Sequence, residues 1–186
     1  MLKATLLAIA DVILLTPTTR SDHRGDFTEI YNVRELATAG IHESFVVDNH
    51  VRNVSANVLR GLHYQREPFG QAKLLRVTRG SIFDVAVDIR PTSPTFGKHV
   101  GVTLTADSMQ LLYVPNGFAH GFCGLEDGSE VHYKVSSYAD PAQASGILWD
   151  DAALGIQWPL AGIPILAERD TMHPTFSEFT AGVLAS

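Results

Sequence analysis

Short apolar and β-branched runs alternate with turn-forming residues over the first three quarters of the chain. The runs occupy residues 6–15, 27–31, 44–51, 73–78, 81–89, 98–104, 111–114, 119–125 and 130–135. The breaks between them contain residues that tight turns require, among them Pro17, Gly25, Gly80 and Gly117. Many short strands with regular turn signals are typical of a β-sandwich or β-barrel, so the pattern predicts an all-β fold.

Only two stretches are predicted to be helical, and both are expected at the periphery. Residues 33–39 follow Asn32, a residue type that caps helix N-termini, and stop before Gly40; a second helix is predicted for residues 177–184. From Trp149 onward, proline and glycine interrupt the chain repeatedly. We expect this tail to wrap around the β core.

Length and composition indicate one domain that spans residues 1–186. The chain is 45% hydrophobic, shows no repeat of fixed period and is long enough for one sizeable core. Its apolar start, residues 1–15, is interrupted by Asp11 and lacks a small-residue cleavage pattern. No window reaches the ~18 uninterrupted apolar residues that a membrane span needs. We therefore interpret this segment as the first strand or two of a sheet and expect no membrane association.

Charge and cysteine content narrow the function classes. The net charge is -6 and the 14 basic residues are scattered, so no basic stripe is available for a nucleic-acid backbone. Cys123 is the one cysteine of the sequence, which excludes an intramolecular disulfide and a multi-cysteine zinc site and is typical of a reducing compartment. We expect a cytoplasmic protein that binds no nucleic acid.

One segment resembles the second motif of the cupin superfamily. Residues 115–120 have the form P-x-G-x-x-H, a turn followed by a strand in which His120 faces the barrel interior. In metal-binding cupins this histidine joins an H-x-H pair and a glutamate around a divalent transition metal. Here the H-x-H position reads His63-Tyr64-Gln65. A neutral amide is a poor replacement for imidazole, so no metal is expected.

Several strands carry polar side chains that a barrel would bring together. They are Arg60, His63, Gln65, Lys73, His120, Tyr133 and Lys134. Inward-pointing residues of different strands converge in an antiparallel barrel, although a solvated strand face would explain each cation equally well. Strand alternation separates some of them, since Lys73 and Arg76 cannot share a face and Tyr133 and Lys134 point in opposite directions.

These residues belong to a longer series of motifs that resembles the dTDP-4-dehydrorhamnose 3,5-epimerases and related nucleotide-sugar epimerases. The matching segments lie in order between about residues 9 and 174, and they are 22–29, 58–65, 71–77, 83–90, 93–97, 114–122, 133–134, 146–151 and 154–159. The resemblance implies a jelly-roll cupin barrel that uses neither metal nor cofactor. It also implies a dTDP-sugar substrate and a homodimer in which N-terminal strands of one subunit reach the neighbour's site.

The resemblance implies catalytic roles as well. His63 looks like the base that removes a proton next to the 4-keto group, and Asp170 looks like its carboxylate partner. Tyr133 looks like the acid on the opposite face, and Lys73 like the cation beside the C4 oxygen. These residue types suit the chemistry, because imidazole can remove an α-proton only if a preorganised charge stabilises the enolate. An aspartate behind the imidazole fixes its tautomer and stabilises the imidazolium.

Further residues look like contacts to the diphosphate, the sugar and the base. They are Arg24 and Glu29 of the partner subunit, Phe27, Asn49, Arg60, Gln65, His120, Tyr138 and Arg169. Arginine suits phosphate because its planar fork binds in bidentate fashion, and Tyr138 could stack on the nucleobase. For Phe27, a place in the hydrophobic core is the alternative.

Three positions depart from the family pattern. Val47 stands where glutamine is usual, Ala144 where glutamate is common and Arg169 where lysine is frequent. The candidate catalytic set is intact while nucleotide and sugar contacts are altered. An epimerase of another nucleotide-linked 4-keto sugar, or one that inverts C3 alone, is therefore the first alternative. A sugar-binding cupin without turnover and a metal-dependent cupin enzyme such as an oxygenase are the alternatives from other classes.

Overall fold

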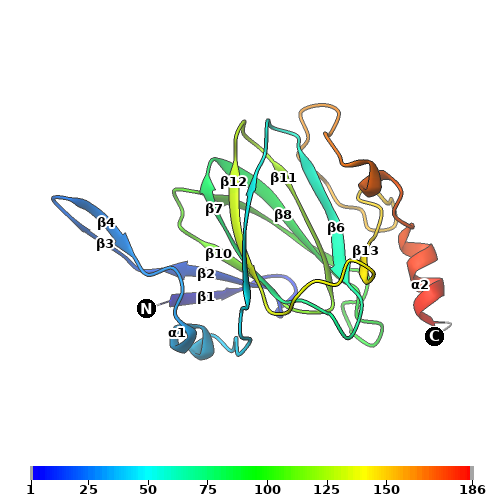
Figure 1. The fold of residues 1–186 in the computed structure, drawn as a ribbon, viewed down its shortest axis with the longest axis horizontal. Coiled ribbons are helices and arrows are strands. Elements are labelled where there is room, and N and C mark those ends of the chain that lie inside the picture. The colour runs from blue at the N-terminus through cyan, green and yellow to red at the C-terminus, as the bar shows by residue number, and fades with distance from the viewer. Residues whose placement is uncertain (1, 185–186) are drawn as a thin grey trace.

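The computed structural model describes residues 2–184, which fold into two antiparallel sheets that face each other (Figure 1). The first sheet has the strand order β1-β2-β10-β7-β12-β5, and the second has the order β13-β6-β11-β8-β9. The strands of the first sheet are β1 (Leu2–Leu6), β2 (Ile13–Pro17), β5 (Val47–Arg52), β7 (Lys73–Arg79), β10 (Leu111–Val114) and β12 (Glu130–Val135). Those of the second sheet are β6 (Leu59–Gln65), β8 (Ser81–Asp88), β9 (His99–Thr105), β11 (Phe118–Gly124) and β13 (Ala144–Gly146). The predicted all-β fold is confirmed.

The remaining elements lie outside the two sheets. Strands β3 (Thr19–Asp22) and β4 (Gly25–Thr28) form a hairpin that projects away from the body (Figure 1). The helical elements are α1 (Val33–Thr38), the 3-10 helix η1 (Glu168–Thr171) and α2 (Phe176–Leu184). Asn32 caps α1 as predicted, since its side chain accepts hydrogen bonds from the first turn. No helix in residues 2–184 is both long and apolar enough to span a membrane.

Strand β8 shows how the side-chain alternation builds two cores. Ile82 and Ala86 pack into a cluster formed by both sheets, while Val85 and Val87 pack into a cluster on the outer face of the second sheet. The outer cluster includes Trp158 and Phe176, so the C-terminal tail does wrap the β core. A third cluster holds α1 against the first sheet through Leu36.

Two apolar runs differ in their bounds from the strands that form. Residues 1–15 do supply the first two strands of a sheet, but the run 6–15 is not itself a strand, because β1 ends at Leu6 and residues 7–12 turn back into β2. Ile9 and Val12 of this turn are buried in the central cluster, which is why the run is apolar without being extended. The run predicted for residues 27–31 ends at Thr28 as part of β4.

Candidate active site

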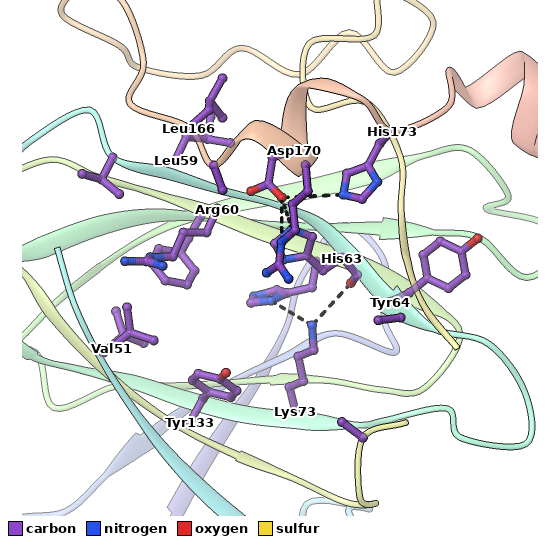
Figure 2. Close-up of a pocket in the computed structure, with 18 of the residues that line it drawn as sticks. Val51, Leu59, Arg60, His63, Tyr64, Lys73, Tyr133, Leu166, Asp170 and His173 are labelled. Carbon is purple, nitrogen blue, oxygen red and sulfur yellow. Dashed lines mark hydrogen bonds and ion pairs between the residues drawn. The ribbon is translucent and has the colours of Figure 1, made fainter. Parts of the chain in front are cut away.

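A cavity of about 920 Å³ lies between the two sheets (Figure 2). Ligand sites in proteins are commonly of this size. Its walls include eight of the predicted site residues, namely Arg60, His63, Gln65, Lys73, His120, Tyr133, Arg169 and Asp170. The predicted convergence of polar side chains is therefore present for six of the seven residues expected to converge, and Arg169 and Asp170 join them. Lys134 does not join them, because its ammonium pairs with Asp48 and lies over the Tyr31 ring.

An irregularity in β6 allows Arg60 and His63 to face the same cavity although their spacing is odd. His63 pairs with His120 and Arg60 with Phe122, so three steps on β6 match two on β11. Gly61 lies between them with φ +151°, and a Cβ there would be 2.6 Å from the Cα of Gly121. Glycine is therefore required at this close approach of the two strands.

The His63 imidazole is held by a buried carboxylate. His63 Nε2 lies 2.7 Å from Asp170 Oδ1, and the backbone N–H of Gly61 is 3.4 Å from Asp170 Oδ2. Asp170 reaches the cavity from η1, and the segment before η1 is anchored where the Leu59 N–H donates to the Ile165 carbonyl. Burial alone would raise the pKa of Asp170, but the hydrogen bond and the charge of His63 hold it below its ordinary value. Asp170 is therefore a carboxylate that can orient and charge-stabilise the imidazole.

Lys73 faces His63 as one end of a second chain of polar groups. Its Nζ lies 3.4 Å from the His63 carbonyl and 3.4 Å from His120 Nδ1. His120 Nε2 in turn lies 2.9 Å from Asp84 Oδ1. Burial lowers the pKa of Lys73 to about 8, while the charge of Asp84 opposes that shift. Burial also lowers the pKa of His120, so a neutral His120 can donate to Asp84 through Nε2 and accept from Lys73 through Nδ1.

Tyr133 comes from β12 and shares the cavity with these groups (Figure 2). Burial raises the pKa of Tyr133, and the charges of Arg60 and Arg169 oppose that rise. Its phenol is therefore protonated near neutral pH and available as a proton donor. Arg60 is oriented by a hydrogen bond of 3.1 Å from its Nε to Asn53 Oδ1, and Gln65 accepts from the Asp140 N–H.

Five predicted substrate contacts lie outside the cavity of the single chain. Asn49 is opposite Tyr133 on the edge strand β5, and Tyr138 is 71% exposed. Arg24 lies at the exposed tip of the β3–β4 hairpin and pairs with Asp22. Glu29, just after that hairpin, accepts from Asn32. Phe27 is 68% exposed on β4, so its placement in the hydrophobic core is wrong.

The positions that depart from the family pattern differ in their access to the cavity. Ala144 on β13 and Arg169 on η1 both line it. Val47 lies at the start of β5 opposite Val135 and is not among the lining residues. Ala144 and Arg169 can therefore contact a ligand in this cavity directly.

Sequence reasoning missed three polar residues that organise the site. Asp84 is fully buried and holds His120, Asn53 is fully buried and holds Arg60, and His173 lies beside Asp170. A carboxylate inside the apolar run 81–89 was a usable signal for Asp84, because buried charges are rarely unpaired. His173 lies in the loop between η1 and α2, and no sequence pattern identified it as a site residue.

The chain is similar to known proteins along most of its length. A family model described as dTDP-4-dehydrorhamnose 3,5-epimerase matches residues 6–178. The dTDP-4-dehydrorhamnose 3,5-epimerase of Escherichia coli is 48% identical over 171 residues, which cover 91% of this chain and 92% of that protein.

Solved structures agree with the sequence match. The dTDP-4-dehydrorhamnose 3,5-epimerase of Bacillus anthracis, with TDP and PPi bound, has a TM-score of 0.92 at 44% identity, covering 95% of this chain and 100% of that one. A dTDP-6-deoxy-D-glucose-3,5-epimerase of Legionella pneumophila, in complex with dTDP-4-keto-L-rhamnose, has a TM-score of 0.90 at 36% identity, covering 96% of this chain and 97% of that one.

Proposed function

The chain belongs to the dTDP-4-dehydrorhamnose 3,5-epimerase family and is an isomerase that acts on a dTDP-4-keto sugar, and we propose that the cavity between its two sheets is the active site. The observation that carries this proposal is the 2.7 Å contact between His63 Nε2 and Asp170 Oδ1. It provides an oriented base in the same cavity as Lys73 and Tyr133. Both reacting carbons, C3 and C5, flank the C4 carbonyl, so one set of groups can serve both.

His63 acts as the base through Nδ1. Because Asp170 is a carboxylate that only accepts hydrogen bonds, it holds the proton of the neutral imidazole on Nε2. The lone pair then lies on Nδ1, where it can take the proton from the carbon next to the ketone. The imidazolium that forms is stabilised by the buried charge of Asp170.

Lys73 stabilises the negative charge that develops on the C4 oxygen. An ammonium fixed by the His63 carbonyl and His120 needs little reorganisation when that charge appears. With a pKa of about 8, Lys73 is about nine-tenths protonated at pH 7. The linked side chains of Asp84, His120 and Lys73 thus hold the ammonium group in position, and the Asp84 carboxylate balances its charge.

Tyr133 returns the proton from the other face of the sugar ring. It stands on β12 of the first sheet while His63 stands on β6 of the second, so the two groups approach a bound sugar from different walls (Figure 2). Removal by His63 and return by Tyr133 invert the carbon. The substrate's own carbonyl holds the electron pair in between, so the steps need no cofactor.

The arginines of the cavity suit the diphosphate of the nucleotide sugar. Arg60 and Arg169 both line the cavity, and a guanidinium can bind phosphate oxygens in bidentate fashion. Gln65 and Ala144 are paired neighbours on β6 and β13 and are placed to contact the sugar. The solved relatives that hold TDP or dTDP-4-keto-L-rhamnose support a dTDP-linked ligand here.

The β3–β4 hairpin completes the site of a second subunit in a homodimer. It projects from the body (Figure 1) and exposes the Phe27 ring, which is a large apolar surface for a monomer to leave in water. Arg24 and Glu29 lie on or beside it, outside the cavity of their own chain. Both residues therefore reach substrate only in the partner's site.

Subunit mixing tests the dimer. Arg24→Ala and His63→Ala homodimers should each be nearly inactive. In a mixed dimer, the Arg24→Ala subunit keeps His63 and receives an intact Arg24 from its partner, so one active site returns. A mixture of His63→Ala with Tyr133→Phe is the control and should regain no net inversion. If the first mixture also stays inactive although mixed dimers form, the hairpin does not complete the neighbouring site.

The cytoplasm is the proposed compartment. Cys123 is buried in the core as a free thiol, and burial raises its pKa to about 11. A reducing compartment keeps such a thiol in that form.

Deuterium labelling tests the reaction itself. The protein is incubated with dTDP-4-keto-6-deoxyglucose in deuterated water, and the label is located by NMR. The proposal requires deuterium at both C3 and C5 of the product. Label at C3 alone would identify a single-carbon epimerase, and absence of label would refute turnover of this substrate.

A further inference from the structure

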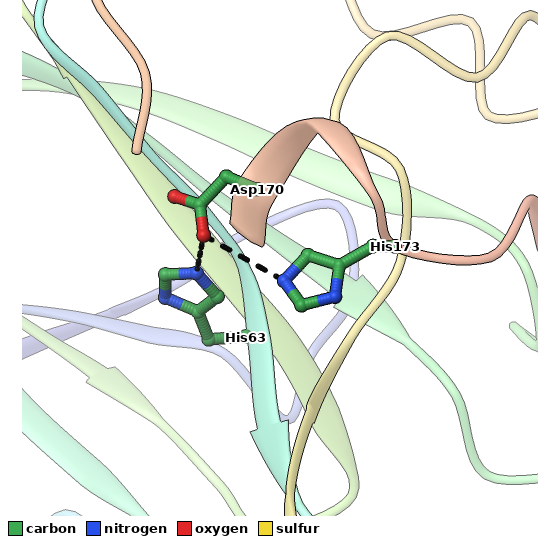
Figure 3. A group of neighbouring side chains, drawn as sticks. All are labelled: His63, Asp170 and His173. Atoms are coloured by element: carbon green, nitrogen blue, oxygen red, sulfur yellow. Dashed lines mark hydrogen bonds and ion pairs between the residues drawn. The ribbon is translucent and has the colours of Figure 1, made fainter. Parts of the chain in front are cut away.

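Three metal-binding atoms meet at the base of the active site. One ring nitrogen of His63, one carboxylate oxygen of Asp170 and one ring nitrogen of His173 all lie within 4.8 Å of one another (Figure 3). Within residues 2–184 this is the one group of three such side chains with that spacing. The Nε2 atom of His173 is buried and has no hydrogen-bond partner, which is unusual because buried polar atoms are nearly always satisfied.

The spacing of His173 fits a shared ligand better than a hydrogen bond. Its Nε2 lies 3.6 Å from Asp170 Oδ1, beyond the ~3.2 Å limit of an ordinary N–H···O bond. Two ligand atoms of one tetrahedral zinc ion, each about 2.1 Å from the metal, are roughly 3.4 Å apart. His63 Nε2, at 2.7 Å from the same oxygen, would have to move away by about 0.7 Å to reach that spacing.

The local packing holds the His173 ring in place beside the His63–Asp170 pair. Gly146 pairs with His63 across β13 and β6, and a Cβ on Gly146 would lie 2.4 Å from His173 Nε2. Because glycine has no side chain, the His173 ring fits against it, at 5.7 Å from the His63 ring and nearly perpendicular to it. His63 and His173 both line the cavity, so an ion can enter from the same side as the substrate.

We propose that His63, Asp170 and His173 form a binding site for a zinc-like divalent transition metal ion, and that this ion inhibits the epimerase. Two imidazoles and one carboxylate are a donor set that zinc accepts, with the fourth position left to water. The inhibition part rests on the proposed function, because it assumes that His63 is the base.

Inhibition follows from the tautomer of His63. A metal bound at Nε2 moves the imidazole proton to Nδ1, with no net proton lost from the ring. Nδ1 then has no lone pair and cannot remove a proton from the sugar. The bound ion also neutralises the Asp170 charge that would stabilise the imidazolium.

A second histidine pair on the surface provides the control. His50 and His132 are opposite each other on β5 and β12, with ring centroids 4.4 Å apart and Glu130 beside them. This pair can also bind zinc, but it belongs to the other side of those strands from Tyr133. Zinc bound there should leave the active site free.

The experiment measures zinc binding and inhibition separately on chelator-treated protein. Isothermal titration calorimetry gives the zinc stoichiometry, and deuterium incorporation gives activity as a fraction of each variant's own metal-free rate. The variants are His173→Ala, His173→Gln, which keeps a polar side chain of similar size, and His132→Ala. Magnesium at the same concentrations tests selectivity, because it prefers oxygen ligands.

The expected result is inhibition of the wild type by zinc and not by magnesium. Both His173 variants should need at least about tenfold more zinc for half-inhibition, and His132→Ala should behave like the wild type. Unchanged zinc inhibition in a folded His173 variant, or relief by His132→Ala, would overturn the site. If metal-free wild type shows no incorporation, the proposed function fails, while the calorimetric loss of one zinc in His173→Ala still decides the metal site.

Discussion

Replacement of Asp170 by asparagine removes the charge behind His63 with little change in shape. Asp170 is 2% exposed and its Oδ1 is 2.7 Å from His63 Nε2. Although burial acts to raise its pKa, the contact with His63 keeps that pKa below its ordinary value. The Asp170 side chain is therefore a negatively charged carboxylate at neutral pH, whereas the asparagine of the variant is neutral.

The size of the effect follows from this one contact. A hydrogen bond to a charged group contributes about 1.5–3 kcal/mol, and about 1.4 kcal/mol corresponds to a factor of ten in rate. Loss of the charge that stabilises the imidazolium should lower kcat by about 10- to 150-fold. The drop becomes larger if the amide group of asparagine donates to Nε2, because the His63 proton is then forced onto Nδ1.

The assay is deuterium incorporation at C3 and C5 under substrate saturation. The matched control is Asp48→Asn, an exposed carboxylate that pairs with Lys134 on the surface, and it should keep the wild-type rate. A folded Asp170→Asn variant with kcat within twofold of the wild type would refute the role of the Asp170 charge in supporting His63 as the base.

Three further predictions concern the acid and the cation. Tyr133→Phe should still remove the proton next to the ketone, which is seen as loss of deuterium from a substrate labelled at that carbon. Net inversion should fall by about 100-fold or more. In the wild type, kcat/KM should fall as pH rises through about 8, because Lys73 loses its proton there; Lys73→Arg stays charged and should abolish this fall, and a persisting fall would contradict the assignment. Asp84→Asn should shift the same alkaline limb to lower pH, since the charge of Asp84 raises the pKa of Lys73; a shift to higher pH would be the wrong sign.

The sequence predicted the sheet strands best where apolar residues alternate or run between turns. Residues 73–78 and 130–135 were placed well because each has one face in a core and ends at a turn or loop. β6 was not among the predicted apolar runs, because Arg60, His63 and Gln65 face the cavity and make the strand polar. The bounds of β1 and β2 were not located for the opposite reason, because the turn between them is itself apolar and its Ile9 is buried.

The candidate site depended on long-range contacts that no local pattern encodes. Asp170 is 107 residues from His63 in the chain and was identified through the family resemblance rather than through spacing. Asp84 and His173 contact other site residues only after the sheets and the tail have packed together. The hairpin residues Arg24 and Phe27 lie outside the cavity of their own chain. A role for Arg24 in a neighbouring subunit was expected from the family resemblance and not from any local pattern.

Loss of His63 tests the central claim most directly. The His63→Ala variant is incubated with dTDP-4-keto-6-deoxyglucose in deuterated water, and incorporation at each carbon is followed by NMR beside the wild type. We predict no incorporation above the uncatalysed rate at either C3 or C5, because the His63 imidazole that Asp170 orients is the base for both carbons. Incorporation at the wild-type rate at either carbon would contradict His63 as the base.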